Sequence, residues 1–259
     1  MRDVSGRLRD KVCVITGATG AIGRESAAVF AREGATVAAI DVKGELACDL
    51  LLRADVSDES QVRDAYEAVA GRFGRIDVLL NNAGIALPED RSVLETGLTT
   101  WNRVIAVNLT SVFLCCKHGI PHLLRSGGGS VVNVSSIVAV VGSATSQIAY
   151  TASKGGVVAM SRELAVEFAK RGVRVNALCP GPVETPMLRT MYTPEQAGRR
   201  LVHMPTGRFA QAAEIAEAAA FLASDSASYV TGTAFPVDGG LAAAFVTAEE
   251  PDSHGTWAG

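Results

Sequence analysis

Short apolar runs alternate with longer segments of helical periodicity along almost the whole chain, and this alternation limits the possible folds most. The apolar runs lie at Val12–Ile15, Ala35–Ile40, Ile76–Leu80, Ser130–Val134 and Val173–Leu178. The helical segments between and after them lie at Ile22–Arg32, 58–73, 99–124, 150–171 and 211–224. Strands that are apolar throughout are buried on both faces, as in a parallel sheet covered by helices. The sequence therefore predicts a doubly wound α/β fold with about seven parallel strands.

No internal repeat, low-complexity tract or linker divides the chain, so we expect a single domain over residues 1–259. Its core is expected at residues 8–241. Residues 182–206, rich in Pro, Thr, Met and Arg, interrupt the alternation and indicate an excursion over one edge of the sheet. Residues 242–259 are expected to form an irregular or interface-forming C-terminal tail.

Composition and charge are those of a soluble globular protein. The net charge is −3, and no run of Lys or Arg exceeds two residues, which excludes a strongly basic nucleic-acid-binding protein. The same charge argues against binding to a membrane surface, and no apolar stretch approaches the roughly 20 residues of a membrane span. The N-terminal residues lack the apolar core of a signal peptide. Five cysteines without a CxxC pair fit reduced thiols, and we expect a cytoplasmic protein.

A glycine-rich turn follows the first apolar run and leads directly into a predicted helix. Its sequence is Thr16-Gly17-Ala18-Thr19-Gly20-Ala21-Ile22-Gly23. Glycines let the backbone turn tightly and approach a pyrophosphate, which then lies at the helix N-terminus. The spacing differs from GxGxxG, and a plain structural turn is the alternative.

An acidic residue ends the second predicted strand. Asp41 follows Gly17 by 24 residues, close to the distance at which dinucleotide-binding folds place a carboxylate beside the adenosine ribose. A carboxylate there accepts hydrogen bonds from the ribose and repels a 2′-phosphate, which favours NAD over NADP. Lys43 lies two residues further on and weakens this preference, and a loop cap is the structural alternative for Asp41.

Tyr150 and Lys154 occupy positions i and i+4 of a predicted helix, so they lie on one face of it. An ammonium group beside a phenol favours the phenolate and lowers the tyrosine pKa from its usual value near 10. The tyrosine then becomes a general acid or base near neutrality. Ser135 and Ser136 end an upstream strand, at the edge where ligands bind in open α/β folds.

Eight short motifs, in order, resemble those of the short-chain dehydrogenase/reductase family, and the similarity covers about residues 8–241. The resemblance implies a Rossmann-type fold and hydride transfer between a nicotinamide cofactor and a carbinol or carbonyl carbon. The motifs are Thr16-Gly17 to Gly23, Asp55-Val56, Asn81-Asn82-Ala83-Gly84, Val107-Asn108-Leu109, Asn133-Val134-Ser135-Ser136, Tyr150 to Lys154, Pro180-Gly181 with Thr185, and Val237-Asp238-Gly239-Gly240.

The resemblance implies a catalytic role for four residues. Tyr150 would exchange a proton with the substrate oxygen, and Ser136 would hold and orient that oxygen. Lys154 would lower the pKa of Tyr150 and bind the nicotinamide ribose. Asn108 would bend its helix and hold a water that links Lys154 to bulk solvent.

The resemblance also implies a set of cofactor-binding residues. In the family the glycine turn holds the pyrophosphate, and an Asp-Val pair borders the adenine. An Asn-Ala-Gly segment lines the adenosine side, and residues after a Pro-Gly pair contact the nicotinamide amide. Together with Asp41 and the Tyr-Lys pair, the corresponding positions give the set Gly17, Thr19, Gly20, Ile22, Gly23, Asp41, Asp55, Val56, Asn82, Ala83, Gly84, Tyr150, Lys154, Pro180, Gly181, Val183 and Thr185.

The glycine turn departs from the family pattern TGxxxGxG. Ala21 replaces the middle glycine, and a glycine stands one place earlier, at Gly20. A methyl group at Ala21 should be tolerable, although the phosphate loop would then differ in shape. Gly20 occupies the place where NADPH-preferring members often carry Arg, which supports NAD.

Two spacings also matter for the site. Only 13 residues separate Asp41 from Asp55, so we expect a truncated helix between the second and third strands and a thinner adenine wall. Ser136 precedes Tyr150 by 14 residues, which fits the family, and Ser135 remains an alternative to Ser136.

The side chains expected near the substrate are mostly apolar, which favours a hydrophobic or medium-sized secondary alcohol or ketone. Residues 182–206 would form a lid segment over this substrate. Core packing is the alternative for about half of these side chains. They are Ile137, Val138, Val140, Val141, Gln147, Ile148, Met187, Leu188, Met191, Tyr192 and Met204.

The favoured function is that of a cytoplasmic NAD-dependent oxidoreductase that acts on a small-molecule alcohol or ketone. We expect it to bind neither nucleic acid nor a membrane. The histidines show no ligand spacing, so we expect no metal site. The family commonly forms tetramers through the helices expected at 99–124 and 150–171, so we expect a homotetramer. The alternatives are an NADPH-dependent 3-oxoacyl-thioester reductase and a non-catalytic dinucleotide-binding regulator.

Overall fold

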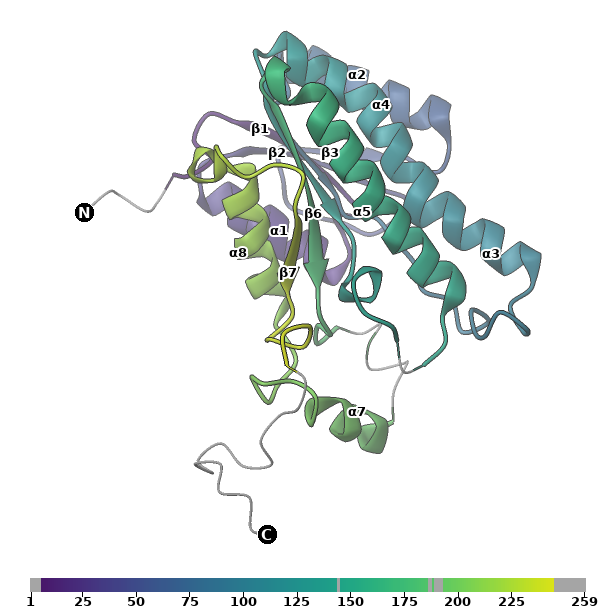
Figure 1. Ribbon diagram of the computed structural model, residues 1–259. Helices are drawn as coiled ribbons and strands as arrows, with labels where there is room; N and C mark the ends of the chain where they lie inside the picture. Colours follow the sequence, from purple (N-terminus) through teal and green to yellow (C-terminus); the bar gives the residue numbers. More distant parts are fainter. Residues whose placement is uncertain (1–5, 144, 186–187, 189–192, 245–259) are drawn as a thin grey trace.

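A sheet of seven parallel strands forms the centre of the computed structural model, which describes residues 6–143, 145–185, 188 and 193–244 (Figure 1). The strand order is β3-β2-β1-β4-β5-β6-β7, and each neighbouring pair is parallel. This confirms the predicted doubly wound α/β fold. The strands are β1 Val12–Thr16, β2 Thr36–Asp41, β3 Leu50–Arg53, β4 Val78–Asn81, β5 Gly129–Val134, β6 Val173–Pro180 and β7 Ala234–Val237.

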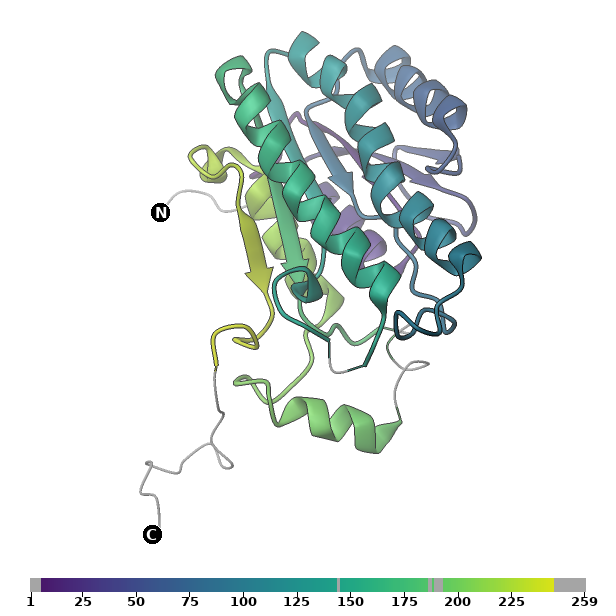
Figure 2. The ribbon, with the colours of Figure 1, turned by 45° about the vertical axis from the view of Figure 1, so that its right-hand side comes forward.

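Helices cover both faces of the sheet (Figures 1 and 2). Helices α1 (Ala21–Arg32) and α8 (Ala212–Ala223) pack together on one face, over an apolar core that contains Phe30 and Leu222. Helices α2 (Glu59–Phe73), α4 (Ser111–Arg125) and α5 (Ile148–Phe168) lie on the other face, over a core that contains Tyr66 and Leu123. The strands are therefore buried on both sides, which explains their continuous apolar sequences.

Helix α3 (Leu98–Ile105) continues through a π-helical turn (Ala106–Thr110) directly into α4. Within the described ranges, this continuous helix, Leu98–Arg125, is the one segment long and apolar enough to cross a membrane. More than half of its most apolar window is buried inside the molecule, as in the core helix of a globular protein.

The connection from β2 to β3 differs from the prediction, because residues 42–49 contain no helix at all. Leu50 pairs with Ala38, so the chain must return along β2 before β3 begins. Eight extended residues span up to about 26 Å, whereas a helix of the same length rises only about 12 Å. A connection without a helix makes the return. Its last residue is fixed by a hydrogen bond of 2.8 Å from the Val37 N–H to the Asp49 carboxylate.

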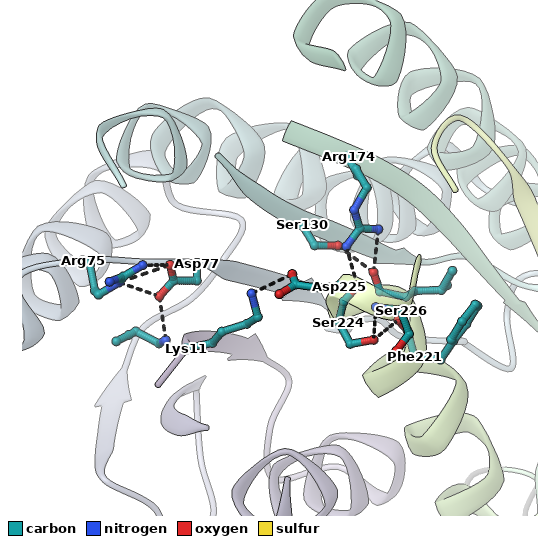
Figure 3. Close-up of polar contacts among 11 residues, drawn as sticks. Lys11, Arg75, Asp77, Ser130, Arg174, Phe221, Ser224, Asp225 and Ser226 are labelled. Atoms are coloured by element: carbon teal, nitrogen blue, oxygen red, sulfur yellow. Dashed lines mark hydrogen bonds and ion pairs between the residues drawn. The ribbon is translucent and has the colours of Figure 1, made fainter. Parts of the chain in front are cut away.

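Charged side chains stabilise the amino edge of the sheet, opposite the carboxyl ends of the strands (Figure 3). Asp77 is buried, accepts the Val12 N–H at 2.8 Å and pairs with Arg75 at 2.6 Å. Arg174 donates to the Leu222 carbonyl at 2.8 Å, at the C-terminus of α8. Both contacts join separate elements, so this edge has a structural role.

Candidate active site

The glycine turn between β1 and α1 leaves no room for side chains at two positions. Gly17 has φ +61°, and a Cβ there would lie 2.7 Å from the Cα of Ala83. A Cβ at Gly23 would overlap the carbonyl oxygen of Gly17. Helix α1 begins at Ala21 without a capping side chain, so its first-turn N–H groups suit an anionic group. This closely packed turn and open helix start fit the pyrophosphate of a dinucleotide.

Asn82 connects the glycine turn to the end of β4. Its side-chain amide donates to the carbonyl oxygens of Thr16 at 3.0 Å and Gly17 at 3.1 Å. In return, the Thr16 hydroxyl oxygen accepts the N–H groups of Asn82 and Ala83 at 3.0 and 3.2 Å. The structure thus brings the predicted residues Gly17, Asn82 and Ala83 together at the carboxyl edge.

Asp41 lies beside the same turn, at the end of β2. Its Oδ2 atom accepts the N–H and the hydroxyl of Thr19, each at 2.9 Å. In the part of the chain that the structure describes, Oδ1 accepts one long hydrogen bond, of 3.4 Å, from the Lys43 N–H. Asp41 therefore stabilises the turn through one oxygen, while the other makes only this long contact among the described residues.

Asp55 and Val56 follow β3 and lie next to β2. The Ala54 N–H donates to the Asp41 carbonyl at 3.3 Å, which places the following residue, Asp55, near Asp41. The Asp55 carboxylate accepts the N–H of Ser57 at 2.9 Å and its hydroxyl at 2.6 Å, and Val56 is buried. Their place at the carboxyl edge agrees with a position beside the adenosine half of a dinucleotide.

Lys154 and Tyr150 lie side by side on α5, as their spacing predicts. The Lys154 Nζ is 5.6 Å from the centre of the Tyr150 ring and donates to the Val134 carbonyl at 2.8 Å. Lys154 is almost completely buried, and this burial lowers its pKa to about 8. Gly84, in the loop after β4, lies close to the Lys154 ammonium group, because a Cβ at Gly84 would be 3.5 Å from Nζ. The ammonium group therefore lies between the tyrosine and the predicted cofactor-binding loop.

Asn108 lies in the π-helical turn, where the helix departs from regular α-helical geometry. Its side-chain Nδ2 donates to the Ile85 carbonyl at 2.9 Å, and its Oδ1 accepts the Ile85 N–H at 2.8 Å. Nδ2 is also 3.3 Å from the Ser153 hydroxyl. Asn108 thus joins the loop after β4 to helix α5, and its role in holding a water stays a prediction.

The two serines after β5 have different environments. Ser135 is buried and its hydroxyl donates to the Lys154 carbonyl at 2.8 Å. Ser136 is partly exposed, and its hydroxyl oxygen accepts the Val138 N–H at 3.4 Å. Because the Ser135 hydroxyl is used within the fold, the geometry favours Ser136 as the residue that meets a substrate.

The remaining predicted residues follow the end of β6. Gly181 packs so closely that a Cβ would lie 2.8 Å from the Asp238 Cα, and it follows Pro180, the last residue of β6. Val183 is buried and pairs with Ala210, while the Thr185 hydroxyl oxygen accepts the Leu188 N–H at 3.2 Å. Beyond them, Met187, Met191 and Tyr192 lie outside the described residues.

Asp90, in the loop between β4 and α3, was not predicted as a site residue. Its carboxylate is buried and binds the first turn of α5, which carries Tyr150. The signal in the sequence is that Gln147, the residue before this helix, is not of a preferred N-cap type, and the structure shows no capping bond from its side chain. No sequence pattern identifies the distant residue that supplies this cap.

No metal centre is apparent in the described parts of the chain, where no group of three His, Cys, Asp or Glu side chains could hold an ion. All five cysteines are free thiols. Burial raises the pKa of the Cys13, Cys115 and Cys116 thiols, so these side chains stay protonated and act as small apolar residues.

Comparison with known proteins agrees with this arrangement of residues. A family model described as enoyl-(acyl carrier protein) reductase matches residues 17–242. The chain belongs to the short-chain dehydrogenase/reductase family. This membership confirms the family resemblance of the sequence and supports an oxidoreductase of secondary alcohols that binds NAD(H) or NADP(H).

Relatives within the family differ in their substrates. A 3-oxoacyl-[acyl-carrier-protein] reductase, FabG, of Thermotoga maritima is 42% identical to this chain. The match covers 91% of this chain and 99% of the Thermotoga protein. Cis-4-hydroxycyclohexanecarboxylate dehydrogenase of Sinomonas cyclohexanicum is also 42% identical, over 90% of this chain and 97% of its own. The crystal structure of levodione reductase superposes with a TM-score of 0.86 at 35% identity, covering 92% of this chain and 100% of that one.

Proposed function

We propose that this chain is an NAD-dependent oxidoreductase that interconverts a secondary alcohol and a ketone on a hydrophobic or medium-sized substrate. The observation that carries the proposal is the Lys154 ammonium group beside the Tyr150 ring, with the partly exposed Ser136 at the same edge of the sheet. When bound, the nicotinamide supplies or accepts the hydride. Residues 1–259 act as one dinucleotide-binding and catalytic domain.

Tyr150 carries the proton in this proposal. In the oxidation direction, the substrate hydroxyl gives its proton to the Tyr150 oxygen, while the same substrate carbon loses a hydride. Ser136 donates a hydrogen bond to the substrate oxygen and fixes its position. Tyr150 accepts this proton as the phenolate, and the Lys154 ammonium group beside its ring stabilises that negative charge.

Asp41 and Gly20 support NAD as the cofactor. Asp41 is fixed beside the glycine turn by Thr19, and a carboxylate at this place repels a 2′-phosphate. Gly20 lacks a cationic side chain that would attract that phosphate. The pyrophosphate would bind along the turn from Gly17 to Gly23, at the start of α1.

Apolar side chains near Ser136 and Tyr150 support a hydrophobic substrate. Val138 and Ile148, the first residue of α5, are partly exposed, and Val140 is exposed. Ile137 and Met204 are buried, which fits the alternative that they pack the core. Helix α7 (Pro194–Leu201) lies beyond the carboxyl ends of the strands (Figure 1), where residues 182–206 would act as a lid.

A second candidate is an NADPH-dependent 3-oxoacyl-thioester reductase, which the 42% identity to a FabG protein favours. The same identity to a dehydrogenase of a cyclic hydroxy acid leaves the substrate class to experiment. The carboxylate of Asp41 argues against a 2′-phosphorylated cofactor.

A rate assay with both cofactors separates the two candidates. Purified protein is given NAD or NADP with a panel of secondary alcohols, and NADH or NADPH with 3-oxoacyl thioesters. Turnover of a secondary alcohol with a preference for NAD is expected. Turnover confined to thioesters with NADPH would establish the second candidate, and NADH binding without turnover on either panel would support a non-catalytic regulator.

We also propose that the protein acts in the cytoplasm as a homotetramer, with a small-molecule substrate and without nucleic acid or membrane. Phe113 on α4 and Val166 on α5 are exposed apolar side chains, which suits packing between copies of the chain. Sedimentation equilibrium is expected to give a molecular mass about four times the 26.9 kDa of one chain.

A further inference from the structure

The helix that carries Tyr150 and Lys154 has no N-terminal cap of its own. Helix α5 begins at Ile148, and the preceding Gln147 makes no side-chain capping bond. Its first turn also contains no acidic residue. The N–H groups of a first helical turn have no partners within the helix, so buried ones need acceptors from elsewhere.

A loop almost 60 residues earlier in the chain supplies these acceptors. The Asp90 carboxylate accepts the Ala149 N–H at 2.9 Å through Oδ1 and the Tyr150 N–H at 2.7 Å through Oδ2. The neighbouring Arg91 carbonyl accepts the Ile148 N–H at 3.2 Å. Two adjacent loop residues therefore bind the first three N–H groups of α5.

Asp90 is suited to hold this helix end rigidly. The residue is only 5% exposed, so its hydrogen bonds are shielded from water. Its negative charge lies at the positive end of the helix dipole, where charge-assisted hydrogen bonds are strong. The loop is fixed in turn, because the Asp90 N–H donates to Leu87 and the Arg91 N–H to the Thr96 hydroxyl.

The same loop is attached to the predicted cofactor site. Asn82 at its start binds the glycine turn, and Ile85 exchanges two hydrogen bonds with Asn108. Asp90 lies five residues further along and ends this series of contacts on the main chain of Tyr150. One loop thus connects the place of the dinucleotide to the residue that would move the proton.

We propose that Asp90 is a positioning residue for the reaction, which fixes the main chain of Tyr150 relative to the cofactor-binding loop. The proposal rests on the proposed function, because it gives Tyr150 the role of proton carrier. Asp90 acts through the N–H groups of Ala149 and Tyr150 and does not itself meet the substrate.

Asp90→Asn tests the proposal, because the amide keeps one acceptor oxygen and loses the charge and the second acceptor. A displaced tyrosine hydroxyl affects the transition state more than substrate binding. We therefore expect kcat to fall roughly 10- to 100-fold, the scale of a misplacement of about 1 Å. The KM and the Kd for NADH are expected to stay within about twofold of wild type.

Asp77→Asn is the matched control. Asp77 is also a buried carboxylate that accepts a main-chain N–H, but it lies at the opposite edge of the sheet (Figure 3). Its variant is expected to lose stability and keep the wild-type kcat. A kcat for Asp90→Asn that is wild-type, or reduced no more than that of the control, would overturn the proposal.

Amide hydrogen exchange provides a measurement that does not depend on turnover. Exchange at residues 148–150 is expected to be faster in Asp90→Asn than in wild type, by more than the change elsewhere in α5. Unchanged exchange there would contradict the proposal, whether or not the wild-type protein turns over a substrate. Faster exchange in Asp90→Asn, combined with no turnover by the wild-type protein, would contradict the proposed function alone. If Asp90→Asn does not fold, Asp90→Ser, which keeps one hydroxyl acceptor, takes its place in both measurements.

Discussion

Asp41 combines a structural and a proposed binding role in one carboxylate. One oxygen accepts two hydrogen bonds from Thr19 in the glycine turn. Among the described residues, the other oxygen accepts a single long hydrogen bond, from the Lys43 N–H. The sequence predicted the position of Asp41 from its spacing to Gly17. The contact with Thr19 could not be predicted, because nothing in the spacing specifies which side chain of the turn it meets.

Asp41→Ala is expected to narrow the preference for NAD over NADP. Removal of the carboxylate eliminates both the ribose acceptor and the repulsion of a 2′-phosphate. We expect the ratio of kcat/KM values for the two cofactors to fall roughly tenfold, equivalent to about 1.4 kcal/mol. Asp64→Ala removes the same charge from the exposed side of α2 and should leave the ratio unchanged. An unchanged ratio in Asp41→Ala would remove this residue from the cofactor site.

Lys154 is a buried ammonium group, and burial of its charge lowers the stability of the folded state. Its folded pKa of about 8 lies below the ordinary value of 10.5, because burial disfavours the charged form. The unfolded chain therefore binds more protons between these pH values, and the stability of the folded state rises as pH increases from about 8 to 10.5.

Lys154→Met is expected to abolish turnover and to raise the free energy of unfolding at pH 7 by about 1 kcal/mol. The rise of stability between pH 8 and 10.5 should be smaller in the variant. Urea unfolding at pH 7 and at pH 10 measures both effects. A variant several kcal/mol less stable than wild type would show that the ammonium group stabilises the fold instead.

Among the elements, sequence patterns predicted the long and buried ones best. The predicted helices at 58–73 and 211–224 agree closely with α2 and α8. Strands β3 and β7 had no predicted range, and each has only four residues, none of them fully buried. The cap of α5 was not predicted, since Asp90 is 59 residues distant from Ala149 in the chain.

Gly23→Ala tests the turn between β1 and α1 as an element. The added methyl group would overlap the Gly17 carbonyl oxygen, so the start of α1 must move. We expect a loss of stability of about 1–3 kcal/mol and at least tenfold weaker NADH binding. Gly71→Ala is the control, because a Cβ at this helical position in α2 meets no atom within 4 Å, and it should slightly stabilise the protein. Wild-type NADH affinity in Gly23→Ala would contradict the assignment of this turn.

In the whole molecule, buried cores on both faces of the sheet leave the carboxyl edge as the place where loops from β1, β2, β4, β5 and β6 meet. The fold followed from the alternation of apolar runs and helices. The candidate site residues could be predicted from short motifs, because most of these motifs follow the carboxyl end of a strand, and Tyr150 and Lys154 keep the i, i+4 spacing of one helix face. The substrate could not be predicted, since the apolar side chains expected near it indicate a class of substrate and not one molecule.

An ion-pair network joins the start of the described chain to the end of α1 and to α8. The Arg7 guanidinium pairs with Glu33 at 2.7 Å and with Glu217 at 2.5 Å. The hydrogen bond from Arg7 lowers the pKa of Glu33 from 4.5 to about 2. This contribution is complete above pH 4.5 and is lost as pH falls through about 2.

Glu33→Gln is therefore expected to show a smaller fall of melting temperature between pH 5 and pH 2.5 than the wild-type protein. Glu25→Gln, at an exposed position of α1, serves as the control and should follow the wild-type curve. Parallel curves for Glu33→Gln and wild type would exclude this ion pair as a source of the acid sensitivity.

The most direct test of the proposed chemistry is the rate of NADH formation by wild-type protein and Tyr150→Phe, with NAD and a secondary alcohol that the wild type oxidises. The variant loses the phenolic oxygen and keeps the ring beside Lys154. We expect the rate to fall by roughly 10²- to 10⁴-fold, with NADH binding close to wild type. A variant that retains the wild-type rate would contradict the role of Tyr150 as the proton carrier.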